Sequence, residues 1–248
     1  MPVPHRFTRF SNLTAACLFA IVALVGSGCG KDKTTNPNPG PGATSTSFEG
    51  TISGNGVSGD LSLKIATANP APQGPARSQA TVTATGTLVT GGSSVGLTGN
   101  YDTVNHAIAV AGGGWTLGGG LTSFGLEGTF TGPGSTSGVF STQRIGSGTD
   151  TVVVVIGTFT STTGGPGGIF NFSIRGAAIH GNAFPNGGTT AIPLDGTYTA
   201  SSGAISIVNA ANPTGPALAT GTLQANGAAS GTYDNQNGDS GTWTGARQ

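Results

Sequence analysis

Side chains capable of acid–base or metal chemistry are scarce in this chain. Its 248 residues include three histidines and two cysteines, and charged residues make up 7%, against about 25% in average proteins. A nucleophilic triad needs a histidine close to a serine and a carboxylate. His106 follows a polar turn and His180 lies in a glycine-rich stretch, so we expect surface or turn histidines. The sequence therefore predicts no catalytic residue, no metal ligand and no cofactor.

Three acidic residues share a local pattern, because Glu49, Glu127 and Asp195 each precede a Gly-Thr pair. Two carboxylates held about 5–10 Å apart could hydrolyse a glycosidic bond. Each acid, however, alternates with apolar residues and points to the opposite face of its expected strand. We therefore expect solvated charges on the outer face of a sheet, where they discourage edge-to-edge pairing.

The segment 234–239 is rich in oxygen ligands of the kind that calcium prefers. Its spacing departs from an EF-hand loop, because Gly238 at the sixth position would place Tyr233 at the first ligand position. A hairpin turn is the favoured interpretation and an ion site the alternative. In that turn Asp234 would accept backbone N–H bonds from two residues on, and Asn237 and Gly238 would tolerate positive φ.

Four aromatic residues are candidates for contact with a ligand. Trp115 and Trp243 could stack on a sugar or seal a core, while Tyr101 and Tyr233 each begin a Tyr-Asp-x-x-Asn segment. Each pair occupies corresponding places in two copies of a repeat, which favours packing in the core or at its rim. These four residues are nevertheless the best candidates for a ligand site.

Strands must position all of these residues, because apolar and polar residues alternate from Phe48 onward between glycine-rich turns. The 46 glycines follow no third-residue period, which excludes collagen. We predict an all-β antiparallel meander that closes into a barrel or flattened barrel of roughly 12–16 strands, with a β-sandwich as the alternative. The continuous apolar run 151–156 is expected to be covered on both faces. Glycines inside strands are expected at bends or beneath a neighbouring aromatic ring.

An internal repeat has copies near 48–117 and 194–245. The copies open with Phe48-Glu49-Gly50-Thr51-Ile52 and Leu194-Asp195-Gly196-Thr197-Tyr198. They continue in the same order through Ala-Asn-Pro, Gly-Pro-Ala, Ala-Thr-Gly-Thr-Leu, Tyr-Asp-x-x-Asn and a tryptophan. Because a unit of about four strands cannot bury a core alone, we expect the copies to join within one all-β domain, 48–248.

The N-terminal residues 1–28 are typical of an export signal. A basic start precedes the apolar stretch 13–25, which is shorter than the roughly 20 residues of a spanning helix. Together with Gly26-Ser27-Gly28-Cys29, this segment resembles the signal peptide and lipobox of bacterial lipoprotein precursors. The resemblance implies lipidation of Cys29 and, because Gly30 rather than Asp follows, release to the outer membrane. Ordinary cleavage after the small-x-small triplet is the alternative, and it retains export without the anchor.

Residues 29–47 then form a lipidated cysteine and a Pro/Gly-rich tether, in which neither helix nor strand should persist. The expected function is that of a lipid-anchored cell-envelope protein with a structural or binding role and no catalysis. A carrier of an apolar small ligand in the barrel interior is the alternative, and a secreted hydrolase is a weaker one. A cavity of about 300 Å³ or more lined by Phe and Leu would favour the carrier, and a filled interior would exclude it.

The expected partners are the membrane, through the N-terminal lipid, and an apolar ligand or an envelope component. The formal net charge is zero, which gives no electrostatic case for nucleic acid. Aromatic residues make up only 6% of the chain, too few for the aromatic girdles of a transmembrane barrel.

Overall fold

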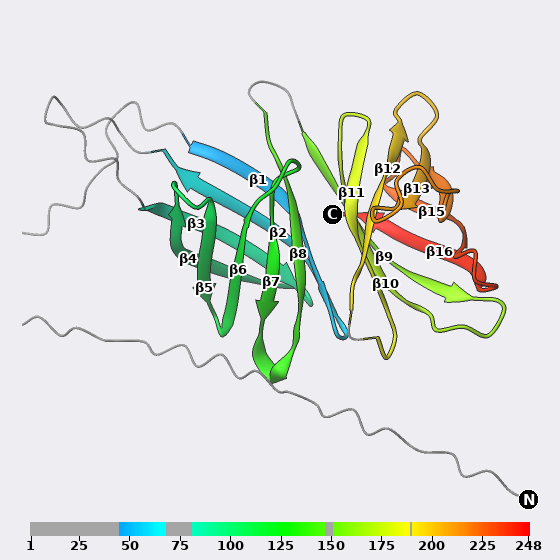
Figure 1. The fold of residues 1–248 in the computed structure, drawn as a ribbon, viewed down its shortest axis with the longest axis horizontal. Coiled ribbons are helices and arrows are strands. Elements are labelled where there is room, and N and C mark those ends of the chain that lie inside the picture. The colour runs from blue at the N-terminus through cyan, green and yellow to red at the C-terminus, as the bar shows by residue number, and fades with distance from the viewer. Residues whose placement is uncertain (1–44, 68–80, 147–150, 189) are drawn as a thin grey trace, which may run out of the picture. The chain divides into compact units, whose positions relative to one another are not determined.

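The computed structural model describes residues 45–67, 81–146, 151–188 and 190–248. These residues form antiparallel strands and a single 3-10 turn, Pro133–Ser135 (Figure 1), which confirms the all-β fold. Among them, no helix is long and apolar enough to cross a membrane. The signal peptide, Cys29 and residues 30–44 of the expected tether lie outside the described residues. The first strand begins at Ser45, slightly earlier than the tether boundary predicts.

The first closed sheet, barrel 1, contains eight strands, and its last strand pairs with its first. These strands are β1 (Ser45–Gly54), β2 (Val57–Ala66), β3 (Thr81–Thr90), β4 (Ser93–Asp102), β5 (Ala107–Gly112), β6 (Trp115–Leu121), β7 (Leu126–Thr131) and β8 (Ser137–Arg144).

The second closed sheet, barrel 2, also contains eight strands, and β16 pairs with β9. These strands are β9 (Val152–Ser161), β10 (Gly168–Arg175), β11 (Ala178–Pro185), β12 (Ile192–Thr199), β13 (Ala204–Asn209), β14 (Ala219–Leu223), β15 (Ala228–Asp234) and β16 (Ser240–Arg247).

The strands therefore close as two barrels of eight, whereas the sequence pattern predicts one barrel of roughly 12–16 strands. The first closure is complete when β8 pairs with β1, from Phe48 opposite Arg144 to Gly54 opposite Gly138. An eight-stranded barrel is just wide enough for side chains to fill it or to hold one small ligand, while 16 strands enclose a channel. Two small barrels thus let this chain bury its apolar side chains without leaving a channel.

The two repeat copies lie in different barrels. The Phe48 copy begins on β1 and its Tyr101 lies on β4, whereas the Leu194 copy begins on β12 and its Tyr233 lies on β15. The tryptophans occupy different places in the strand order, because Trp115 lies two strands after Tyr101 and Trp243 only one strand after Tyr233. Each copy is completed into a barrel by strands that do not belong to it. The first Ala-Asn-Pro lies outside the described residues.

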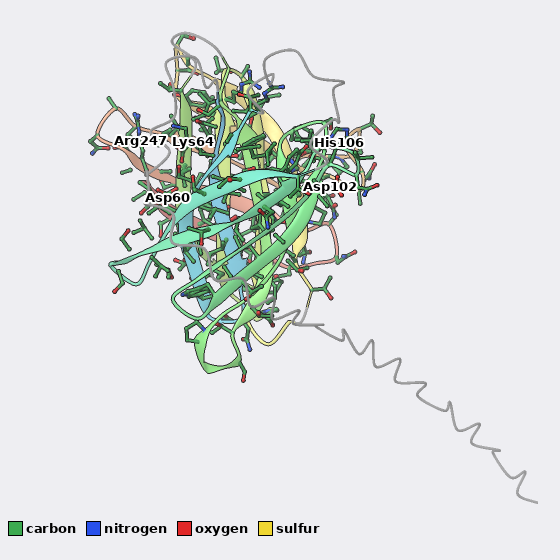
Figure 2. The ribbon with its side chains drawn as sticks, turned by 90° about the vertical axis from the view of Figure 1, so that its left-hand side faces the viewer. Asp60, Lys64, Asp102, His106 and Arg247 are labelled. Atoms are coloured by element: carbon green, nitrogen blue, oxygen red, sulfur yellow. The ribbon has the colours of Figure 1, made fainter. Side chains whose placement is uncertain are left out.

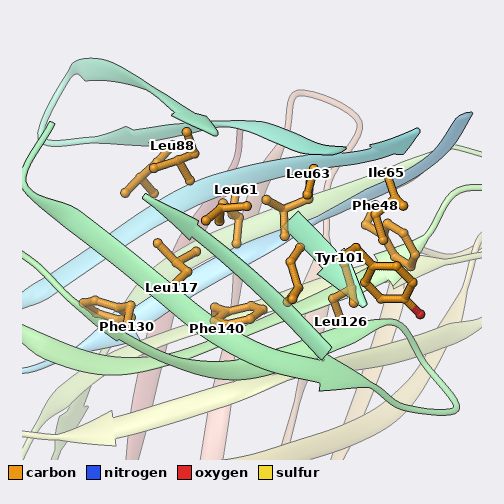
Figure 3. Close-up of a cluster of buried hydrophobic side chains, with 14 of the residues drawn as sticks. Phe48, Leu61, Leu63, Ile65, Leu88, Tyr101, Leu117, Leu126, Phe130 and Phe140 are labelled. Carbon is orange, nitrogen blue, oxygen red and sulfur yellow. The ribbon is translucent and has the colours of Figure 1, made fainter. Parts of the chain in front are cut away.

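Alternate residues of each strand fill the barrel interiors. Figure 3 shows the interior of barrel 1, where leucine and phenylalanine side chains from several strands meet. Aromatic rings lie over strand glycines, as expected: a Cβ on Gly221 or Gly231 would come within 2.3 or 2.7 Å of the Trp243 ring. The glycines in these strands therefore make room for the rings that fill the core.

The outer faces of four strands are also buried, because β1 and β8 of barrel 1 contact β10 and β11 of barrel 2. Both barrels belong to one compact unit. The side chain of Asn171 accepts a hydrogen bond from Thr51 at 2.6 Å and donates one to the Ile52 carbonyl at 2.8 Å. Gln143 donates to the backbone carbonyl of Ser173 at 2.7 Å. The contact between the barrels is therefore polar and hydrogen-bonded.

The apolar run 151–156 is covered on both faces, as predicted. Val154 and Val155 are adjacent on β9, so their side chains point to opposite faces, and both are buried. Val155 belongs to the core of barrel 2. The outer face of β9 is covered by β1 and β2, which contact it.

Candidate functional site

An apolar cavity of about 200 Å³ opens at one end of barrel 2. It lies where hairpins turn, because Pro166, Leu218 and Asn235 line it from the β9–β10, β13–β14 and β15–β16 connections, and Pro185 lines it from the end of β11. The cavity is smaller than the volume of about 300 Å³ at which the carrier function would be favoured. It exceeds the roughly 150 Å³ at which an apolar cavity admits benzene. The interior of barrel 2 therefore has room for a molecule of about one ring.

Aromatic rings form much of the cavity wall. Phe170 meets Trp243 edge to face, with ring centroids 5.4 Å apart and planes at 82°. Phe159 meets Tyr233 in the same way, at 5.5 Å and 80°. The indole N–H of Trp243 donates to the Thr220 carbonyl at 3.2 Å, which satisfies the one polar atom of this ring. This geometry fixes the orientation of the rings.

A carboxylate stands at the rim of this apolar wall. Asp239 lines the cavity and accepts hydrogen bonds from Ser161 at 2.5 Å, from Thr163 at 2.9 Å and from the Tyr233 hydroxyl at 3.4 Å. The Ser161 bond, followed by the other hydroxyl bonds, holds the pKa of Asp239 below its ordinary value although partial burial raises it. The cavity therefore has one charged end and an apolar body.

The loop that carries Asp239 is a turn of the predicted kind. Asp234 accepts a backbone hydrogen bond from Gln236, two residues on, at 2.9 Å. Gly238 has positive φ, and so does Gln236 rather than Asn237. The loop after Tyr101 is built similarly, since Asp102 accepts bonds from the backbone of Val104 and Asn105, and Figure 2 labels Asp102 and His106 on it.

In barrel 1, side chains fill the interior around Tyr101, the residue that corresponds to Tyr233 in the repeat. Tyr101 is 7% exposed, and a 3.0 Å hydrogen bond joins its hydroxyl to His106 Nδ1. Figure 3 shows its ring beside Phe48 and Leu126, which occupy the barrel interior. The ring of Tyr233 also meets an aromatic neighbour, Phe159, but it lies on the wall of the cavity. The two barrels thus differ in how their tyrosine ends are packed.

The structure brings together two of the four aromatic residues proposed from the sequence. Tyr233 and Trp243 line the barrel 2 cavity. Trp115 and Tyr101 are core residues of barrel 1 at opposite ends of β5, since Tyr101 pairs with Ile108 and Trp115 with Gly112. Asp239, Phe159 and Phe170 also line the cavity, although their sequence pattern does not mark them as site residues. The alternation over 170–174 indicates which face of that strand is apolar, but it cannot reveal which barrel leaves space.

A second polar cluster surrounds His180, which is a buried strand residue and not the expected surface or turn histidine. His180 lies on β11, and its Nδ1 is 2.6 Å from Asp195 Oδ1 on β12. Its Nε2 contacts Glu127 Oε1 on β7 of barrel 1. The ring of Phe124 stacks on the imidazole, with centroids 4.1 Å apart.

This arrangement fixes the protonation of the histidine. Carboxylates only accept hydrogen bonds, so an imidazole with a carboxylate on each nitrogen donates from both and carries a positive charge. Burial lowers the pKa of His180, but hydrogen bonds and charge from Glu127 and Asp195 outweigh it and hold the pKa above 6.5. With both nitrogens occupied, His180 has no lone pair with which to activate a nucleophile. The cluster is suited to holding the two barrels together.

Glu49, the third predicted outer-face acid, is also not freely solvated. Ser62 donates to its carboxylate at 3.0 Å. Burial raises the pKa of Glu49, as does the nearby charge of Asp60, and burial raises the pKa of Asp60 as well. Neither acid lines the barrel 2 cavity. All three predicted acids occupy the outer faces of their strands, but contacts with neighbouring side chains partly cover them.

Comparison with known proteins finds no matching family model, no matching curated protein and no matching solved structure.

Proposed function

We propose that this protein is an exported, lipid-anchored envelope protein whose second barrel binds a small apolar molecule and performs no catalysis. The observation that carries the binding role is the cavity of about 200 Å³ walled by Phe170, Leu194 and Trp243. Binding a compound of one ring and a short chain would remove apolar surface of both partners from water.

The contrast between the barrels supports a role for the cavity. An enclosed void of this size would lower stability by about 5 kcal/mol relative to a filled core, at roughly 24 cal/mol per Å³. Because this cavity is partly open to water, its cost is smaller than that. In barrel 1, strands of the same type fill the barrel interior with buried side chains. An interior that remains open despite this cost is consistent with selection for an occupant.

The N-terminal segment supports the location. An export signal, a cysteine at its end and a Pro/Gly-rich spacer suit a domain held away from a membrane surface. The outer membrane is the proposed site of attachment, since Gly30 follows Cys29.

Titration with propylbenzene tests the binding role. The Cys29→Ala form is suitable because it carries no lipid, so the purification needs no detergent that could fill the cavity. Calorimetry should detect one propylbenzene per chain, and Ala183→Phe should abolish binding because Ala183 lines the cavity. Ala109→Phe is the matched control, since Ala109 is exposed on β5 of barrel 1. If the Cys29→Ala form does not bind, or if the same form with Ala183→Phe folds and binds equally well, the proposed function is wrong.

Labelling with a radioactive fatty acid tests the anchor. Wild type should incorporate the label and sediment with membranes, and Cys29→Ala should do neither. Cys17→Ala controls for the loss of any cysteine, because Cys17 lies within the expected signal peptide. Membrane association that persists unchanged in Cys29→Ala would refute the anchor.

A further inference from the structure

The polar end of the cavity indicates the chemical class of the ligand. We infer that barrel 2 prefers a small apolar amine, whose ammonium group sits at the Asp239 carboxylate and whose apolar body lies against Phe170 and Trp243. This inference depends on the proposed binding role and adds to it the charge of the ligand.

Asp239 provides a negative charge that its protein partners do not neutralise. Its hydrogen bonds come from the hydroxyl groups of Ser161, Thr163 and Tyr233, which stabilise a carboxylate but carry no charge. Among the described residues that line the cavity, none is lysine, arginine or histidine. A cationic ligand would therefore supply the opposite charge that the cavity wall does not provide.

The hydroxyl groups also hold the carboxylate in place before a ligand arrives. Ser161 lies at the end of β9, and its Oγ also accepts the Gly165 N–H at 2.8 Å. Thr163 Oγ1 accepts the backbone N–H of Ser240 at 3.1 Å. These bonds join the β9–β10 and β15–β16 connections around Asp239. A preorganised carboxylate binds a cation with less loss of conformational entropy than a mobile one.

The aromatic wall favours the same ligand. The rings of Tyr233 and Trp243 line the cavity together with Asp239, and the faces of such rings attract cations. An acidic ligand would be repelled by Asp239. A neutral alcohol could donate one hydrogen bond there but would gain no charge attraction, and charge-assisted hydrogen bonds are roughly twice as strong as neutral ones.

Three probes of similar size test the inference: 2-phenylethylamine, 2-phenylethanol and propylbenzene. We expect the amine to bind the Cys29→Ala chain about tenfold more tightly than the alcohol at low salt. Asp239→Asn should remove that preference, and it should weaken binding of the amine far more than binding of propylbenzene. Asp234→Asn is the matched control, because Asp234 ends β15 directly before the same loop, is exposed and does not line the cavity. This variant should keep the preference.

The outcomes separate this inference from the proposed function. If Asp239→Asn loses the amine preference and Asp234→Asn keeps it, both the inference and the binding role are supported. Equal binding of all three probes, with no effect of Asp239→Asn, overturns the inference and leaves the binding role intact. Failure of the Cys29→Ala chain to bind any of the three overturns the binding role and the inference together. Circular dichroism of each variant verifies that a change in affinity does not arise from unfolding.

Discussion

His180→Gln should weaken the attachment of one barrel to the other. The substitution removes the positive charge between Glu127 and Asp195 and leaves two carboxylates facing a neutral amide. Breaking a buried ion pair by removing one partner costs about 3–5 kcal/mol. The side chains of Glu127 and Asp195 keep 29% and 24% exposure, so water compensates in part. We expect a loss of about 2 kcal/mol in the free energy of unfolding.

The loss should depend on pH in a direction set by the histidine. The pKa of His180 in the folded protein lies above 6.5, its value when unpaired. Protonation of His180 therefore stabilises the folded state fully below about pH 6.5, and this contribution is lost as the pH rises through the folded pKa. The stability difference between wild type and His180→Gln should be largest near pH 6 and shrink toward pH 9.

Urea unfolding followed by circular dichroism measures this difference at both pH values. Asn237→Ala, at an exposed position, is the control and should unfold as wild type does at both pH values. A difference between wild type and His180→Gln that is below about 0.5 kcal/mol, or one that grows from pH 6 to pH 9, would refute a stabilising charge on His180 between Glu127 and Asp195.

Two further substitutions test the packing. Asn171→Ala removes the partner of Thr51 and the donor to the Ile52 carbonyl, so we expect urea unfolding to reveal a loss of about 2 kcal/mol; Asn237→Ala, at an exposed position, should change stability by less than about 0.5 kcal/mol. Gly221→Ala places a methyl group about 2.3 Å from the Trp243 ring, so we expect thermal melting to occur some 4–8 °C lower. Gly96→Ala, whose methyl group would meet no atom within 4 Å, should melt close to wild type. Equal effects in either matched pair would contradict the packing described above.

The sequence predicts the class of fold because the strand signal is local. Alternation with period two, glycine-rich turns and the Tyr-Asp-x-x-Asn loops determine strands and hairpins over a few residues. Closure is a long-range property, since it depends on the pairing of Phe48 with Arg144, and no local pattern distinguishes one barrel from two. The apolar run at β9 was informative because burial on both faces removes alternation.

The sites were harder to predict because they arise where distant segments meet. Glu127 and His180 belong to different barrels, so each appears isolated in the sequence. An outer-face acid and a histidine in a glycine-rich stretch give no sign that a second barrel covers them. Tyr233 and Trp243 were found through the repeat, yet the same argument also selected Tyr101 and Trp115, whose barrel is filled. Whether an interior holds space depends on side chains from every strand together.

The central claim is that barrel 2 holds an apolar cavity that a small molecule can enter. A crystal structure of the Cys29→Ala chain under xenon pressure tests it most directly, because xenon enters apolar cavities of this size. We predict a xenon peak among Phe170, Leu194 and Trp243 and no peak in the interior of barrel 1. A barrel 2 interior that is packed shut, or xenon bound only elsewhere, would contradict the account.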